Sequence, residues 1–196
     1  MNAPHPPMTK QAGMALVTSL LLLVVITILA LSMFRSFGTQ EKIAGNLREK
    51  ERALHAAESA QQYAEWWLLQ GTNSAVGSVT CTAGTLIASV TVGQICNQSM
   101  QAQGILLTQV PWAAQVSYTP LGMVIQTSAY TPTAGNSNPP YFATPAFYIT
   151  DRGAADDGKG EAYQIDAYGY GSAASTVAVV ESTYEVQQGV VNRGGL

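Results

Sequence analysis

The hydrophobic pattern begins with one long uninterrupted run near the start of the chain. Residues 14–34, MALVTSLLLLVVITILALSMF, contain no charged side chain. As a helix these 21 residues would rise about 31 Å, which matches a bilayer hydrocarbon core of about 30 Å. A secretory signal normally has a shorter apolar region, although Ala30-Leu31-Ser32 offers a small-x-small cleavage pattern. We therefore predict a helix that is kept and spans the membrane.

The polar residues that follow keep a helical spacing. Apolar side chains recur every three, four or seven residues, which predicts one stripe on a continuing helix; they are Ile43, Leu47, Leu54, Ala57, Ala64 and Leu68. We expect this second half of the helix to cover residues 35–70 and Gly71 to end it. Trp66 and Trp67 are adjacent, so they cannot face the same way. One should pack on the rest of the domain, and the other should lie near its edge.

Beyond Gly71 the pattern changes from a period of 3.6 to a period of 2. We predict strands over 112–120, 122–130, 146–150, 161–171 and 175–187, a hairpin turn over 151–160, a loop over 132–140, and short or irregular strands over 78–96. In the last strand Ala178, Val180, Ser182, Tyr184 and Val186 form one side. A striped helix and antiparallel strands bury both apolar faces by packing together, so the predicted fold class is α+β.

Few residues of the chain are candidates for catalysis or for binding a metal ion. The two histidines, His5 and His55, have no nucleophile or metal-ligand spacing near them, so we predict no enzyme, no cofactor and no metal site. The acidic stretch from Asp151 to Glu161 offers carboxylates for a calcium loop, but it lacks the EF-hand spacing and favours an Asp/Gly turn. Net charge is −3 and no basic block interleaves with aromatics, which argues against nucleic-acid binding.

The two cysteines, Cys81 and Cys96, are fifteen positions apart. We predict a disulfide between them, which would stabilise the fold by roughly 3 kcal/mol and would require an oxidising compartment. Two buried free thiols are the alternative.

Charge gives a conflicting signal for the orientation in the membrane. Lys10 stands alone before the apolar run, whereas five basic residues follow it within 35–52, so the positive-inside rule alone would place the large domain in the cytoplasm. Acidic side chains accompany those basic residues, and the cysteines and the hydroxyl-rich composition favour an exported domain. We therefore expect the C-terminal domain to face the periplasm.

Three stretches together resemble a known family. KQAG followed by MALVTSLLLLVVITILAL looks like a prepilin processing region, with a short leader that ends in Gly13. EKIAGNLREKERALHAAESAQ is similar to the segment that follows in PilX-type minor pilins of the type IV pilus, and YQIDAYGYG with STVAVVESTYEV fits their closing strands. The resemblance is strong over 10–66 and weaker over 145–187.

The resemblance implies a processing and assembly route. A prepilin peptidase would cut between Gly13 and Met14, and the new terminus would be methylated. Residues 1–13 would be the leader, 14–34 the membrane and filament-core helix, 35–70 the spine of the head, and 71–196 the antiparallel-sheet head. Assembly would rest on helix packing by Thr18, Leu20, Leu23, Val24, Ile28 and Leu31. Expected partners are other minor pilins, the major pilin, a pilus-tip adhesin and the inner membrane before assembly, with adhesion and twitching motility as the cellular context.

One departure from the family pattern carries information. Most pilins have a glutamate at the fifth residue after the cut, and here that residue is Thr18. The family pattern implies that pilins without this glutamate take part in the priming complex at the filament tip. The GspK-type tip pseudopilin of type II secretion shares the departure and is one alternative. A single-pass membrane-anchored periplasmic binding domain, with no filament, is the other.

Overall fold

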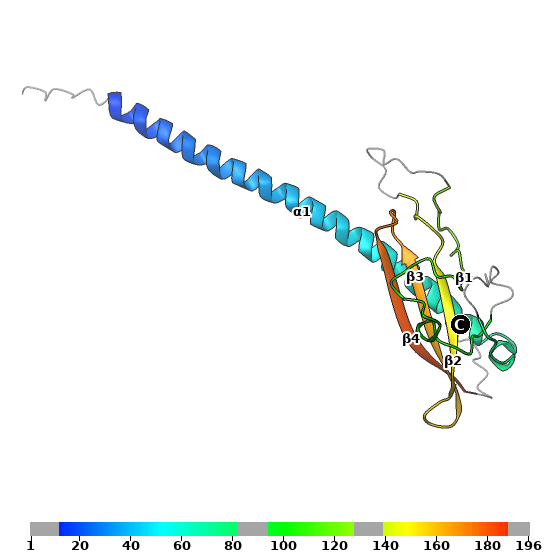
Figure 1. The fold of residues 1–196 in the computed structure, drawn as a ribbon. Coiled ribbons are helices and arrows are strands. Elements are labelled where there is room, and N and C mark those ends of the chain that lie inside the picture. Colours follow the sequence, from blue (N-terminus) through cyan, green and yellow to red (C-terminus); the bar gives the residue numbers. More distant parts are fainter. Residues whose placement is uncertain (1–11, 82–93, 128–138, 188–196) are drawn as a thin grey trace, which may run out of the picture. The chain divides into compact units, whose positions relative to one another are not determined.

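The computed structural model describes residues 12–81, 94–127 and 139–187 (Figure 1). Helix α1 (Ala12–Leu68) is followed by two short 3₁₀ helices, η1 (Asn73–Ala75) and η3 (Gln101–Gln103). Strands β1 (Val116–Ser117), β2 (Ala146–Ala154), β3 (Gly160–Tyr170) and β4 (Val177–Gln187) complete the order. The chain divides into two units, residues 1–46 and 47–196. One long helix packed on an antiparallel sheet confirms the α+β class.

The four strands form one antiparallel sheet in the order β1-β2-β3-β4. The strands expected over 146–150, 161–171 and 175–187 are present, and β2 extends to Ala154, so the hairpin connection shortens to 155–159. In β4 the expected alternation is present: Val180, Ser182, Tyr184 and Val186 are half-buried, whereas Glu181, Thr183 and Glu185 are exposed.

Two expected strands differ from the structure. The strand over 112–120 is reduced to β1, and the described part of 122–130 forms only an isolated bridge between Ile125 and Tyr141. The cause is a turn closed by the Met123 N–H on the Pro120 carbonyl at 3.1 Å, with Gly122 at φ 81°. In the expected irregular stretch 78–96, Val79 bridges Cys96, while 82–93 lie outside the described residues, as do 132–138 of the expected loop.

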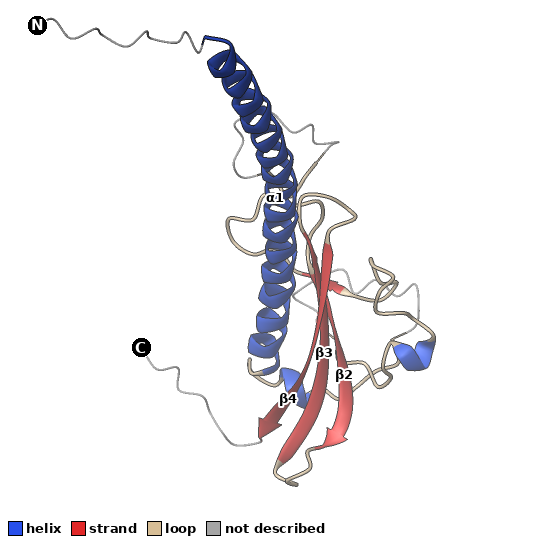
Figure 2. Cartoon of the chain, turned by 90° about the vertical axis from the view of Figure 1, so that its left-hand side faces the viewer, coloured by secondary structure: helices blue, strands red, loops and turns tan. Residues whose placement is uncertain are grey.

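The part of α1 that belongs to the second unit packs on the sheet through small side chains. Figure 2 shows this part of the helix running beside β2, β3 and β4. The buried residues on it are Ala53, Ala56, Ala57, Ala60, Ala64, Trp67 and Leu68. The predicted stripe was therefore right at Ala57, Ala64 and Leu68. It was wrong at Ile43, Leu47 and Leu54, which are exposed. Alanine replaces leucine at the contact because the backbones approach too closely for a long side chain: a Cβ on Gly169 of β3 would lie 2.5 Å from the Ala57 nitrogen.

The end of α1 agrees closely with the expectation from Gly71. The helix ends at Leu68, and the Leu69 and Gln70 N–H groups bond to the Trp66 and Trp67 carbonyls in a tighter turn. The Asn73 side-chain amide donates a further bond to the Trp67 carbonyl at 2.8 Å. Gly71 then takes a left-handed φ of 57°, which a residue with a Cβ adopts only at a cost.

The second face of the sheet is covered by connecting segments. Successive strand residues point to opposite faces, so Tyr168 lies on the face away from Gly169 and α1. Trp112 meets the Tyr168 ring edge-on at 4.8 Å, and the Tyr168 hydroxyl donates to Gln115 Oε1 at 2.7 Å. The Tyr148 hydroxyl donates to the Gln98 carbonyl at 2.9 Å. A layer built from residues 95–115 thus covers β2 and β3 on this face, which the strand pattern did not predict.

Candidate functional site

The most distinctive surface of the chain is the apolar first part of α1. From Met14 at 73% to Phe34 at 74%, its large apolar side chains are exposed on all sides of the helix. The predicted assembly residues Thr18, Leu20, Leu23, Val24, Ile28 and Leu31 all lie on it and are exposed. This helix is long and apolar enough to cross a membrane. A surface of this kind requires an apolar environment.

The hydroxyl groups within the apolar segment bond to its own backbone. Thr18 donates to the Met14 and Ala15 carbonyls at 3.1 Å, Ser19 to Leu16 at 2.9 Å, Thr27 to Val24 at 2.8 Å and Ser32 to Ile28 at 2.9 Å. These bonds leave no hydroxyl donor of the segment without a partner. The segment is therefore suited both to lipid and to a dry helix bundle.

The predicted processing pair lies at the start of the described chain. Ala12 and Gly13 are the first two residues of α1, so the helix begins two residues before Met14. Residues 1–11 of the predicted leader lie outside the described residues. Cleavage between Gly13 and Met14 stays a prediction.

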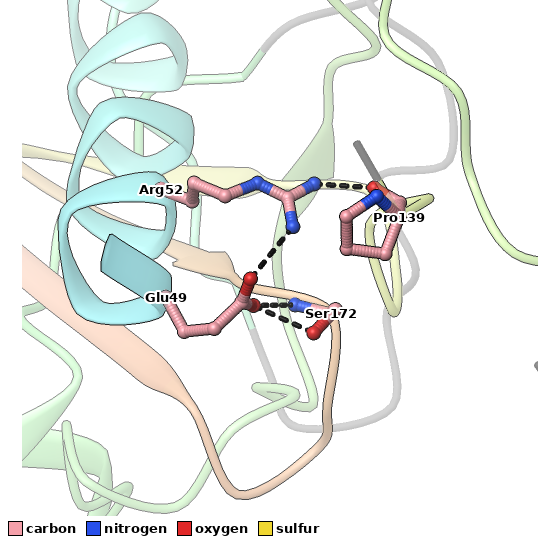
Figure 3. A network of polar contacts seen from close by, with 4 residues as sticks. All are labelled: Glu49, Arg52, Pro139 and Ser172. Atoms are coloured by element: carbon pink, nitrogen blue, oxygen red, sulfur yellow. Dashed lines mark hydrogen bonds and ion pairs between the residues drawn. The ribbon is translucent and has the colours of Figure 1, made fainter. Parts of the chain in front are cut away.

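A polar network joins α1 to two connections of the head (Figure 3). Glu49 Oε2 accepts bonds from the Ser172 backbone N–H at 2.7 Å and from its hydroxyl at 2.6 Å. Arg52 forms an ion pair with Glu49 at 2.9 Å and donates to the Pro139 carbonyl. The Arg52 guanidinium also lies 4.5 Å from the centre of the Tyr141 ring. The network thereby fastens the turn after β3 and the segment before β2 to one turn of α1.

The charge state of Glu49 follows from these contacts. Partial burial acts to raise its pKa, but the Ser172 hydrogen bonds and the Arg52 charge outweigh it and hold the pKa below the ordinary value. Sequence reasoning missed this role, because Glu49 and Arg52 read as an ordinary helix-surface pair. Their partners, Ser172 and Pro139, are distant in the sequence and carry no signal of their own.

We expect Glu49→Ala to lower the free energy of unfolding by about 1–3 kcal/mol, because it leaves the Ser172 donors and the Arg52 charge without their acceptor. Since the folded-state pKa of Glu49 is depressed, its contribution is present at neutral pH and is lost as pH falls below about 4.5. Thermal unfolding of the full chain in detergent micelles at pH 7 and pH 4 measures both effects. Glu51→Ala, on an exposed position of the same helix, is the matched control. Equal loss of stability in the two variants would contradict the role of the network.

Cys81 and Cys96 are joined by a disulfide, with a Cα–Cα distance of 5.4 Å. The backbone of Cys96 pairs with β2 on the same edge as β1. Its N–H donates to the Ile149 carbonyl at 2.9 Å, and its carbonyl accepts from the Asp151 N–H at 2.8 Å. The disulfide thus ties the segment after η1 to Cys96, which covers the edge of β2 next to Ile149 and Asp151. An edge covered in this way is protected from pairing with other chains.

The adjacent tryptophans face different surroundings. Trp67 is 9% exposed and belongs to the core, whereas Trp66 is 52% exposed and lies beside the Tyr63 ring at 5.3 Å. In the acidic hairpin the Asp151 and Asp157 carboxylates accept bonds from the Gly153 and Lys159 N–H groups, which accounts for them as turn residues. No cluster of three potential metal ligands occurs among the residues that the structure describes.

A buried carboxyl in the sheet also escaped the sequence reasoning. Asp166 of β3 is fully buried and lies directly opposite the exposed Glu181 of β4. Burial raises the pKa of Asp166 to about 6; the Gln164 amide, which donates to both carboxylate oxygens at 3.1 and 3.2 Å, opposes the rise, and Glu181 adds to it. The charged form of Asp166 therefore destabilises the folded head at neutral pH.

We expect Asp166→Asn to stabilise the head above pH 6, by an amount on the order of 2 kcal/mol, because it removes the buried negative charge. The folded-state pKa is raised, so the wild-type chain gains stability from Asp166 below about pH 4 and loses it as pH rises to about 6. The advantage of the variant should therefore be absent at pH 4 and complete at pH 7 in thermal unfolding. Asp156→Asn, in the exposed hairpin, should show no such dependence. An advantage equal at both pH values would contradict the assignment.

An apolar segment that can span a membrane, continued by a helix packed on an antiparallel sheet, agrees with the arrangement that the resemblance to type IV pilins implies. The family model described as PilX N-terminal matches residues 12–61. Residues 12–61 are therefore similar to the N-terminal region of PilX-type pilins, and the recognition made from the sequence is confirmed over these residues. No curated protein and no solved structure matches the chain.

Proposed function

We propose that the chain is a minor pilin that primes assembly of a type IV pilus and lies at or near the pilus tip. The carrying observation is the apolar segment 14–34 within the PilX N-terminal match, exposed on all sides and internally hydrogen-bonded. Thr18 supports the tip position, because the segment lacks a carboxylate that could neutralise a neighbouring subunit's terminal amine. A subunit without this carboxylate lacks one ion pair that other pilins form with a neighbouring subunit.

In this proposal the chain first sits in the inner membrane as a single-pass protein with a periplasmic head, and then enters the filament. The disulfide supports an oxidising compartment for the head. Its partners are the prepilin peptidase, other minor pilins, the major pilin and a tip adhesin. Its role is structural and does not involve catalysis.

Mass spectrometry of the chain from sheared surface filaments and from inner membranes tests the proposal. We expect the filament-bound chain to start at Met14 and to carry one extra methyl group. A chain that starts at Met1 and occurs only in membranes would contradict it and favour a plain membrane anchor. Thr18 fits a type II secretion tip pseudopilin equally well, so the filament fraction is also examined for co-purifying proteins. Co-purifying minor pilins would support a role in the type IV pilus, and co-purifying secretion pseudopilins would support a role in type II secretion.

A further inference from the structure

An aromatic groove lies on the head, between α1 and the segment after β1. Its lining is Ser59, Gln62, Tyr63 and Trp66 of α1 together with Tyr118, and it is an open groove with a volume of about 390 Å³. This volume falls in the lower part of the range of small-molecule sites. The groove lies outside the apolar segment 14–34 and outside the Glu49 network, so neither of those features accounts for it.

The aromatic rings of the groove form an ordered platform. Tyr63 and Tyr118 stack at 4.1 Å with their planes 18° apart, and Trp66 stands at 44° to Tyr63 with its centre 5.3 Å away. Because Trp67 occupies the buried position of the pair, Trp66 has half of its surface open to solvent. The faces of aromatic rings are electron-rich and attract weakly positive C–H groups. A flat ligand that carries C–H groups on one face would pack well on Trp66.

The polar groups of the groove specify the rest of the ligand. The Ser59 hydroxyl donates its hydrogen to the Ala56 carbonyl at 2.7 Å, so only its acceptor capacity remains. The Gln62 amide offers both donors and an acceptor, and within the described part of the chain neither it nor the Trp66 N–H has a hydrogen-bond partner. A ligand must therefore both donate and accept. A proline-rich segment has carbonyl acceptors but few donors, whereas the hydroxyls of a saccharide supply both.

The lining also contains no charged side chain. A charged ligand would lose hydration there without gaining a counter-charge. We propose that this groove binds a neutral saccharide, with the C–H face of one pyranose ring on Trp66 and its hydroxyls on Gln62 and Ser59. This activity goes beyond the proposed assembly role and would give the subunit a contact of its own with a glycan surface.

Ligand-observed NMR with the full chain in nanodiscs tests the proposal. The nanodiscs are made of phosphatidylcholine, because this lipid has no sugar headgroup that could compete with the probes. The probes are maltotetraose, chitotetraose and lacto-N-tetraose, with decaproline and sialyllactose as comparisons. We expect at least one neutral probe to bind, and Trp66→Ala and Gln62→Ala to weaken that binding at least about tenfold. Gln61→Ala is the matched control, since Gln61 is bonded to Glu65 and does not line the groove. It should bind as the wild type does.

Each other outcome overturns the saccharide assignment. The proposal fails if no neutral probe binds, if Trp66→Ala leaves binding unchanged, or if decaproline or sialyllactose binds in place of the neutral probes. Recovery of the same variants in sheared filaments is measured in parallel. Trp66→Ala should enter filaments normally, so a loss of both filament entry and saccharide binding would indicate a subunit contact. Filament entry thus separates failure of the groove from failure of the proposed pilin role.

Discussion

Gly169→Ala should destabilise the head strongly, because the added methyl group has no room between β3 and α1. The new Cβ would lie 2.5 Å from the Ala57 nitrogen, 2.6 Å from the Ala56 Cβ and 2.7 Å from the Ala56 carbonyl carbon. Two of these atoms belong to the backbone of α1, so no side-chain rotation relieves the contact. The helix must move away from β3, which loosens the alanine face that it buries. We expect a loss of about 3 kcal/mol or more in the free energy of unfolding, at the upper end of overpacking effects.

Urea unfolding of the full chain in detergent micelles, followed by tryptophan fluorescence, measures this loss. The control makes the same chemical change in α1, where a Cβ on Gly45 would meet nothing within 4 Å. Gly45→Ala should therefore be neutral or stabilising by up to about 1 kcal/mol, from helix propensity alone. If both variants unfold at the same urea concentration, the close approach of α1 to β3 is wrong.

The same close approach shows how far periodicity could predict this fold. The helix and strands β3 and β4 were predicted because each repeats an apolar position over eleven residues or more, and β2 was predicted only over its first five residues, 146–150. The face that α1 buries was predicted less well. The predicted stripe included Leu47 and Leu54, which are exposed. The contact with Gly169 is made by Ala56 and Ala57, because only a small side chain fits there. The size limit comes from a strand more than a hundred residues later, and no local pattern records it.

The burial of Asp166 and the contacts of Glu49 could not be predicted from the sequence, for a related reason. Asp166 alternates with Ile165 and Ala167, as a solvent-facing residue of a half-buried strand would. It is buried because an irregular segment covers that face, and irregular segments have no period. The two cysteines, in contrast, could be paired from the sequence, because the chain has only these two. The contacts that long irregular connections make are therefore the part that remained unpredicted.

Leu23→Arg should remove the chain from filaments if the proposed assembly role holds. Leu23 lies near the middle of the uncharged run 14–34, where arginine costs about 2.5–3.5 kcal/mol on membrane insertion. In a dry bundle of apolar helices the same charge would be costly to bury, and residues 14–34 of this chain supply no carboxylate to pair with it. Both environments of the segment thus oppose the substitution. We expect the chain recovered from sheared filaments to fall more than about tenfold, while an inserted fraction persists in the membrane.

Immunoblots of the sheared-filament and inner-membrane fractions measure this distribution. Leu121→Arg is the matched control, because Leu121 is fully exposed on the head and its substitution by arginine costs no burial. It should enter filaments as the wild type does. Normal filament entry of Leu23→Arg would show that the segment does not pack in a dry filament core. Loss of both variants would instead point to a defect in export or stability, and urea unfolding of Leu121→Arg distinguishes these two causes.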